Sequence, residues 1–207
     1  IGIPKLKEIK VKQIIREEGP KNHFLKQGTP TMGGIFFIPI GIIISNILYF
    51  NKEDYKIILT LSFVVIFFMF IGFIDDFLSL KKQLNTGLKS KEKIILQSFI
   101  SLIFIIICAS NNLISQNIHV ANKILNIGNL IYPLGIFVLL AESNSTNLTD
   151  GLDGLLSGCS VLIFTGLAIT ILIENPSNNA TLAPICIVMA GTCMGFLFLN
   201  KYPAKLF

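Results

Sequence analysis

Four aspartates stand beside long apolar runs of this sequence, where a charged side chain is energetically costly. Asp75 and Asp76 close one run, and Asp150 and Asp153 precede another. Ionisable residues at membrane depth are rare and usually functional, and adjacent carboxylates repel each other unless they share a cation or a proton. The alternative for the first pair is two interfacial charges that end a helix, where they would oppose the helix dipole. We therefore expect these aspartates to handle a cation or a proton.

Hydrogen-bonding side chains recur every three residues around the second pair: Asn144, Asn147, Asp150 and Asp153. If this stretch is helical, they lie along one side of the helix. Amide donors could then meet a phosphate or a nucleobase edge beside carboxylates that hold a metal ion or a ribose, or act as a base. Gly151 would permit a tight turn or the close approach of a ligand to the backbone. A solvated turn is the alternative, because Asn, Asp and Gly are ordinary turn residues.

A third cluster, residues 26–34, ends where the first apolar run begins. It combines Lys26 and the hydroxyls of Thr29 and Thr31 with three glycines, and backbone N–H groups at the start of a helix bind anions well. Glycine-rich segments also begin membrane helices that bind nothing, so this cluster alone decides little. It is not a Walker A loop, because the lysine precedes the glycines.

Five lysines follow the first aspartate pair within one loop: Lys81, Lys82, Lys89, Lys91 and Lys93. Singly, each is most simply a marker of the cytoplasmic side of a membrane. Together with the two acids, they form a site where lysine and Mg²⁺ could share the charge of a diphosphate. Mg²⁺ commonly binds through one or two carboxylates and substrate phosphates. The three clusters therefore favour phosphoryl transfer with Mg²⁺ as the cofactor.

The elements that must position these residues are membrane helices. The chain of 207 residues is 52% hydrophobic and only 14% charged, against about 25% charged in a soluble domain. Six runs of about 17 to 20 residues match a hydrocarbon core about 30 Å thick, and without alternating polarity they predict helices. We expect an all-α, polytopic transmembrane bundle with crossings at 34–50, 57–74, 94–110, 124–141, 154–173 and 182–199.

Basic residues orient this bundle, because loops rich in Lys and Arg stay in the cytoplasm. With six crossings, 14 of the 17 Lys and Arg residues fall on the side of the N-terminal segment, as do all three polar clusters. We expect one membrane domain: a cytoplasmic basic segment at 1–33, the crossings at 34–199, and the start of a cytoplasmic loop at 200–207. The net charge of +5 then indicates anionic lipid or phosphorylated substrates and not nucleic acid.

These segments resemble, in order, the signatures of the phospho-N-acetylmuramoyl-pentapeptide transferase family, within the polyprenyl-phosphate sugar-1-phosphate transferase superfamily. The matching segments are 16–21, 28–34, 72–76 with Gly87-Leu88, and 147–155. The resemblance implies that UDP-N-acetylmuramoyl-pentapeptide binds from the cytoplasm at the plasma (inner) membrane, and that undecaprenyl phosphate attacks its sugar-linked phosphate. UMP then leaves and lipid I, a peptidoglycan precursor, remains in the membrane.

The resemblance also implies roles for individual residues. Asp75 and Asp76 would serve the lipid phosphate or its deprotonation, and Lys91 would neutralise phosphate. Asp150, the third catalytic residue, would hold the nucleotide diphosphate and ribose region together with Asn147. The residues implied near the uracil are Lys26, Gly151 and Asp153, whereas Asn144 and Thr31 match the substrate-binding motifs without a clear role.

Two departures from the family pattern stand out. Family members commonly carry a lysine where this chain has Ser79, so that phosphate contact is absent or has moved to Lys81 or Lys82. The family has about ten crossings, with an Mg²⁺-binding aspartate and a His-rich loop that would lie beyond residue 207. The metal ligands of this chain therefore stay unassigned, and we expect this chain to be inactive alone.

Other interpretations remain open. A related enzyme could transfer N-acetylglucosamine-1-phosphate to the same lipid, and an ion-coupled transporter could also use acids near membrane depth. The polar motifs lie in loops or at run ends and not in the middle of a run, which favours an enzyme. The sequence leaves the oligomeric state open, with a homodimer as one candidate.

Overall fold

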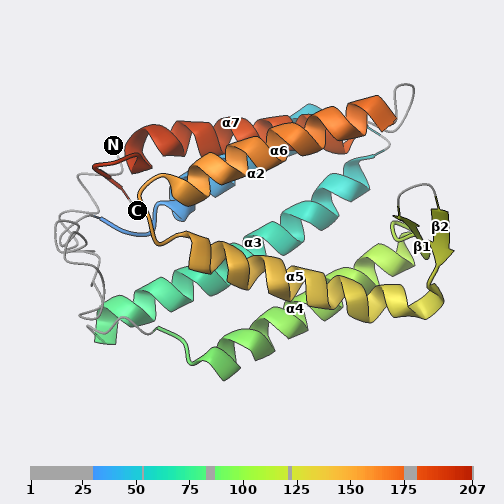
Figure 1. Ribbon diagram of the computed structural model, residues 1–207, viewed down its shortest axis with the longest axis horizontal. Coiled ribbons are helices and arrows are strands. Elements are labelled where there is room, and N and C mark those ends of the chain that lie inside the picture. The colour runs from blue at the N-terminus through green and yellow to red at the C-terminus, as the bar shows by residue number, and fades with distance from the viewer. Residues whose placement is uncertain (1–29, 53, 83–86, 121–122, 175–180, 207) are drawn as a thin grey trace.

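The computed structural model describes residues 30–52, 54–82, 87–120, 123–174 and 181–206. Within these ranges the chain forms six α-helices and a small β-hairpin (Figure 1). The helices are α2 (Gly34–Tyr49), α3 (Tyr55–Lys82), α4 (Ser90–Ser110), α5 (Ile131–Thr149), α6 (Leu155–Glu174) and α7 (Leu182–Asn200). The hairpin pairs β1 (Asn117–Val120) with β2 (Lys123–Asn126), and a 3₁₀ turn (Gly128–Leu130) leads into α5. The expected helical bundle is confirmed.

Length and composition mark this bundle as a multi-pass membrane protein. Four helices, α3, α4, α6 and α7, are long and apolar enough to cross a bilayer, and α2 is a shorter apolar helix. Their outer surfaces expose large apolar side chains, such as Ile47 at 70% and Leu162 at 74%. Contiguous apolar surface of this kind is rare on soluble monomers, whereas lipid covers it at no such cost.

The six helices run back and forth, so that one end of the bundle collects the starts of α2, α4 and α6 and the ends of α3, α5 and α7 (Figure 1). We call this the aspartate end, because Asp75, Asp76, Asp150 and Asp153 lie on or beside these helix termini. Neighbours in sequence pack together, α3 on α4, α4 on α5 and α6 on α7, and α2 packs on both α3 and α7. The alternation that the apolar runs predicted is therefore what gathers the distant clusters.

The fourth expected crossing, 124–141, is wrong in its limits. Residues 123–126 form β2, and Gly128, at a φ of +53°, ends the strand while its N–H donates to Asn126 Oδ1 (3.0 Å). Such a turn is typical of an Asn-x-Gly sequence. Helix α5 then begins at Ile131 and continues through polar residues to Thr149. It can do so because hydroxyls of Ser145, Thr146 and Thr149 donate to carbonyls one turn back, which is compatible with a helix.

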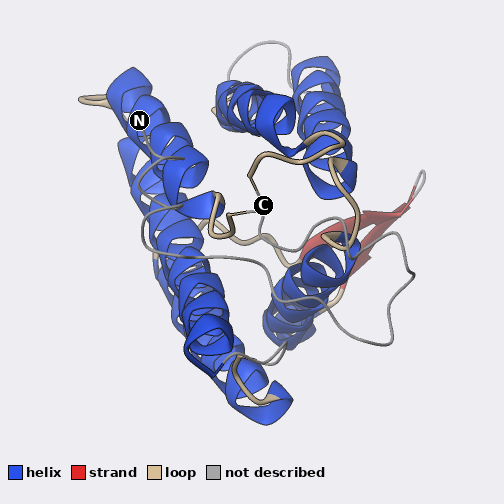
Figure 2. Ribbon diagram, turned by 90° about the vertical axis from the view of Figure 1, so that its left-hand side faces the viewer, coloured by secondary structure: helices blue, strands red, loops and turns tan. Residues whose placement is uncertain are grey.

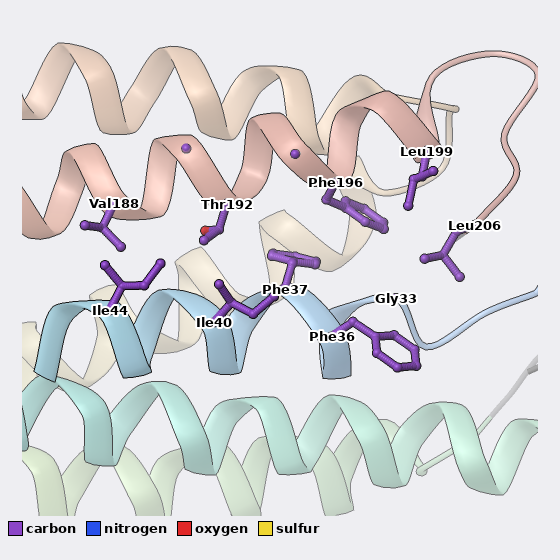
Figure 3. Close-up of a pocket in the computed structure, with 12 residues that line it drawn as sticks. Gly33, Phe36, Phe37, Ile40, Ile44, Val188, Thr192, Phe196, Leu199 and Leu206 are labelled. Atoms are coloured by element: carbon purple, nitrogen blue, oxygen red, sulfur yellow. The ribbon is translucent and has the colours of Figure 1, made fainter. Parts of the chain in front are cut away.

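An apolar groove of about 550 Å³ separates part of α2 from α7. Figure 3 shows side chains of the two helices, including Ile40 and Val188, that line the groove from opposite sides. At one point the helices touch, where the rings of Phe37 and Phe196 stack with centroids 4.6 Å apart. Because none of the lining side chains is charged, we look for the chemistry at the helix ends.

Candidate functional site

Asp75 is held by two bonds at the end of α3. Its Oδ2 accepts from Lys93 Nζ at 2.9 Å, an ion pair in which the Lys93 and Asp75 side chains are only 14% and 20% exposed. Its Oδ1 accepts from the backbone N–H of Leu88 at 2.8 Å. Hydrogen bonds between charged partners are shorter and stronger than neutral ones. Asp75 is therefore fixed in place and carries a compensated charge.

Lys93 joins three helices at the aspartate end. Besides Asp75 of α3, its ammonium donates to Asn147 Oδ1 of α5 at 2.9 Å, while Lys93 itself lies in the first turns of α4. That helix starts where Glu92 Oε2 accepts from the backbone N–H of Lys89 (3.1 Å), which is one half of the capping box seen at helix starts. Lys93 thus brings together two residues of the predicted site that are 72 positions apart in sequence.

Lys93 is a residue that the sequence predicted only as one of five lysines beside the acids, without singling it out. The resemblance assigned phosphate neutralisation to Lys91, which is exposed on α4 and stays a prediction. Lys91 and Lys93 lie about 200° apart around the helix axis, so they point in different directions. The signal that singles out Lys93 is its four-residue spacing from Gln97, which marks a polar edge on an otherwise apolar helix.

Asp76 is in a different environment from its neighbour. One residue further along α3, it points about 100° away from Asp75 and is exposed. Within the described ranges it forms no hydrogen bond or ion pair. The adjacent acids thus lie in different surroundings, since only Asp75 is bonded to neighbouring elements among the described residues.

Gly87 makes the approach to Asp75 possible. A Cβ atom on this residue would lie 1.9 Å from the backbone oxygen of Asp75 and 2.6 Å from its Oδ1. The Gly87 carbonyl also accepts from Lys82 Nζ at 2.7 Å, so Lys82 is engaged with the backbone here. The loop can return to the helix and place the Leu88 N–H on Asp75 only because this residue lacks a side chain.

Asn144 is used within the protein. Its Nδ2 donates to Gln97 Oε1 (2.9 Å) and to the carbonyl of Leu140 (2.8 Å), which occupies both of its donors. Gln97 is 1% exposed and donates in turn to Ser143 Oγ (2.9 Å). Asn144 therefore has only its Oδ1 left as an acceptor, and its evident role is to lock α5 against α4, one turn from the Lys93–Asn147 contact.

Replacing Gln97 with leucine is expected to lower the free energy of unfolding by about 1 to 3 kcal/mol, because one amide donor of Asn144 and the hydroxyl of Ser143 lose their partner. Thermal unfolding of the purified full-length protein in detergent would measure this. The exposed substitution Lys91→Gln on the same helix should leave the melting temperature unchanged. Equal melting of Gln97→Leu and the parent protein would show that the network contributes no stability.

The predicted stripe of four side chains does not form. Helix α5 ends at Thr149, and Asp150 is its C-cap, with its N–H donating to the Thr146 carbonyl at 3.2 Å. Gly151 and Asp153 lie in the turn before α6. Only Asn144 and Asn147 share a helix, since the Asp-Gly sequence favours a turn over continued helix. Asp150 and Asp153 remain at the same end of the bundle but not on one helical face.

The turn after α5 is tied to the chain that follows α7. Asp153 Oδ2 accepts from the backbone N–H of Ala204 at 3.1 Å. Asn200, 1% exposed at the end of α7, accepts from Gly154 N–H (3.0 Å) and Ser157 Oγ (3.1 Å), and donates to the Leu206 carbonyl (3.1 Å). Gly154 has a φ of +75°, and a Cβ there would lie 3.2 Å from Leu197. Asn200 thus fixes the position of this turn.

The Gly-rich cluster reaches the same end. Lys26 lies outside the described residues. The Oγ1 of Thr31 is buried and forms no hydrogen bond with any residue that the structure describes. Met32, at a φ of +69°, packs its buried side chain against Leu206 in a cluster that includes Phe73 of α3. Parts of all the predicted clusters therefore meet at the aspartate end.

A metal ion would find few ligands among the described residues, which contain no group of three or more His, Cys, Asp or Glu side chains suited to hold one. Both oxygens of Asp75 already accept hydrogen bonds, whereas Asp76 is exposed. The arrangement fits an ion bound by one carboxylate and completed by substrate phosphates, a common mode for Mg²⁺.

The amino-acid sequence is similar to known proteins. Residues 58–207 match the model of glycosyl transferase family 4, and residues 26–38 match phospho-N-acetylmuramoyl-pentapeptide-transferase signature 1. A phospho-N-acetylmuramoyl-pentapeptide-transferase of Prochlorococcus marinus strain NATL2A is 88% identical over 207 residues, 100% of this chain and 56% of that protein. The enzyme of the same name from Synechococcus sp. strain CC9605 is 45% identical over 208 residues, 100% of this chain and 59% of that protein. The chain thus spans little more than half the length of these relatives.

Proposed function

Because this chain belongs to glycosyl transferase family 4, we propose that it forms part of a phospho-N-acetylmuramoyl-pentapeptide transferase. The enzyme would transfer the phosphosugar from UDP to undecaprenyl phosphate, releasing UMP and leaving lipid I. The observation that carries this proposal is the position of Lys93, which joins Asp75 and Asn147 at the end where the Asp150 turn also lies. A cation between helices, beside an open carboxylate, suits two phosphate groups that must meet.

In the proposed reaction, an oxygen of the lipid phosphate attacks the sugar-linked phosphorus, a new P–O–P bond forms, and the bond to UMP breaks. Asp76 would accept the proton of the lipid phosphate when that group is protonated, because it is the exposed member of the acid pair. Lys93 would stabilise the charge that develops on the transferred group. Asn147 and Asp150 would hold the nucleotide, with Gly151 and Asp153 beside its uracil.

We propose Mg²⁺ as the cofactor, with Asp76 as one ligand beside phosphate oxygens of the substrates. When bound, the ion would reduce the repulsion between the two anionic substrates and draw charge from the leaving group. Asp75 would act indirectly, by orienting Lys93 and the backbone of Leu88.

We propose that the aspartate end faces the cytoplasm at the plasma membrane. The excess of Lys and Arg on that side supports this orientation, and a soluble UDP-sugar is available there. The transporter alternative gains no support, since the matching relatives are named as transferases.

Release of UMP by the full-length protein tests this function. UDP-N-acetylmuramoyl-pentapeptide with undecaprenyl phosphate should give UMP in the presence of Mg²⁺, and removal of Mg²⁺ with EDTA should stop it. UDP-N-acetylglucosamine should give at most a trace. Faster release from UDP-N-acetylglucosamine would support the related enzyme instead, and no release from either sugar would refute both.

Replacing Lys93 with glutamine is expected to lower kcat/KM for UMP release by about 10- to 100-fold, because hydrogen bonds to charged groups contribute about 1.5 to 3 kcal/mol. Steady-state kinetics in detergent would measure it. Lys91→Gln serves as the comparison, since that side chain is exposed on the same helix. If Lys91→Gln lowered kcat/KM more than Lys93→Gln, Lys91 would be the lysine that neutralises phosphate, as the family resemblance implies, and the proposed role of Lys93 would be wrong.

A further inference from the structure

The β1–β2 hairpin lies at the end of the bundle opposite Asp75, between α4 and α5 (Figure 1). Each strand has only four residues, and an isolated two-stranded hairpin of this size is at best marginally stable in water. The segment between α4 and β1 stays close to the end of α4, because the N–H of Leu113 donates to the Cys108 carbonyl at 2.8 Å. The hairpin must therefore gain stability from what surrounds it at the membrane surface.

The register gives the hairpin one apolar face. Ile118 pairs with Leu125 and Val120 pairs with Lys123, so these four side chains share a face. Val120 and Leu125 are 52% and 48% exposed. The opposite face carries Ile124 beside a polar pair, in which Asn126 Nδ2 donates to Asn117 Oδ1 at 2.9 Å. An exposed apolar face on so small an element needs a cover.

The position of the hairpin points to lipid as this cover. Viewed along the bundle, the strands project sideways beyond the neighbouring helices (Figure 2). Helix α4, which leads to the hairpin, exposes Phe99 at 61% and Ile106 at 57%, as expected of a helix that faces lipid. The described hairpin residues include Lys123 and no acid, a charge that suits anionic lipid head groups.

We propose that the hairpin docks on the bilayer, with its Ile118, Val120 and Leu125 face in the boundary between head groups and acyl chains and with Lys123 at lipid phosphate. This interaction anchors the α4–α5 connection to the leaflet opposite the aspartate end. It does not depend on the proposed enzymatic function, because it rests only on the amphipathic register and the place of the hairpin.

Tryptophan fluorescence tests this proposal, because the chain contains no tryptophan. Leu125→Trp reports on the apolar face, and Ile124→Trp, its neighbour on the opposite face and 64% exposed, is the matched control. The full-length protein is placed in nanodiscs of phosphatidylglycerol and phosphatidylcholine, and the emission of the unsubstituted protein is subtracted. Quenching by lipids brominated along the acyl chain is compared with quenching by aqueous iodide.

We expect brominated lipid to quench the tryptophan at position 125 at least about threefold more than the one at 124, with the reverse order for iodide. Val120→Trp is a second reporter on the apolar face, in case the first variant does not fold. Equal iodide quenching of both faces would overturn the proposal. So would a residue at 125 shielded from both quenchers, since this would mean that protein covers the face.

Discussion

Replacing Asp76 with asparagine should lower kcat for UMP release by about 10³-fold and leave the melting temperature unchanged. Positioned acid–base groups typically contribute 10²- to 10⁴-fold to rate, and the amide can neither accept the lipid phosphate proton nor bind Mg²⁺ as a carboxylate does. Stability should persist because Asp76 is exposed and forms no hydrogen bond with other described residues. Single-turnover UMP release and thermal unfolding of the full-length protein measure the two effects.

Asp75→Asn is the matched comparison on the adjacent residue. It should lower both activity and melting temperature, because the ion pair with Lys93 is lost and the ammonium keeps Asn147 as its hydrogen-bond partner among the described residues. A loss of activity alone would thus indicate a residue that acts on substrate, whereas a loss of both activity and melting temperature would indicate a residue that holds the helices together. If Asp76→Asn retained near-parental kcat, or if it unfolded as early as Asp75→Asn, the division of roles would be wrong.

Replacing Gly87 with alanine should reduce UMP release by at least about 10²-fold. The added Cβ would meet the Asp75 backbone oxygen at 1.9 Å, and neither backbone can yield without moving the Leu88 N–H away from Asp75. Displacements of about 1 Å near a reacting centre can lower rates by about 10²-fold. Initial rates of UMP release, measured over a range of concentrations of each substrate, would show whether kcat falls. A lower kcat is expected if the substitution displaces Asp75 and Lys93.

Gly72→Ala is the control for this substitution. Gly72 lies on the same helix as Asp75, and a Cβ there would meet nothing within 4 Å. Alanine favours helix over glycine by about 1 kcal/mol, so this variant should be at least as stable and as active as the parent. Full activity of Gly87→Ala would mean that the close approach of the loop to α3 is not needed for catalysis.

The sequence predicted which polar clusters lie at one end of the bundle, because that follows from two properties of the sequence alone. The length of the apolar runs predicts crossings, and their alternation then places Asp75 and the turn at Asp150 at one end. The predicted crossing at 124–141 has the wrong limits because residues 124–126 belong to a strand. In addition, α5 continues through Ser145 and Thr149, whose hydroxyls donate to carbonyls of the same helix. Hydropathy does not distinguish a short surface strand from the start of a crossing.

The roles of individual residues depend on rotation about helix axes, which composition does not reveal. Lys91 and Lys93 are equivalent in charge and nearly so in sequence position, yet only Lys93 faces Asp75 and Asn147. Likewise, Asn144 matches a substrate-binding motif, but its amide group donates hydrogen bonds to Gln97 and to a carbonyl of its own helix. Such partners become visible only when α3, α4 and α5 are packed together.

The bonds from Asn200 and Ala204 to the turn at Asp153 have a consequence for how the protein is made. Asp153 and Ala204 are 51 positions apart, so the ribosome must add α6, α7 and several further residues before that turn can take its final shape. Until then, the segment that would hold the nucleotide lacks its supports. Completion of this turn thus has to follow the synthesis and membrane insertion of α6 and α7 as a pair.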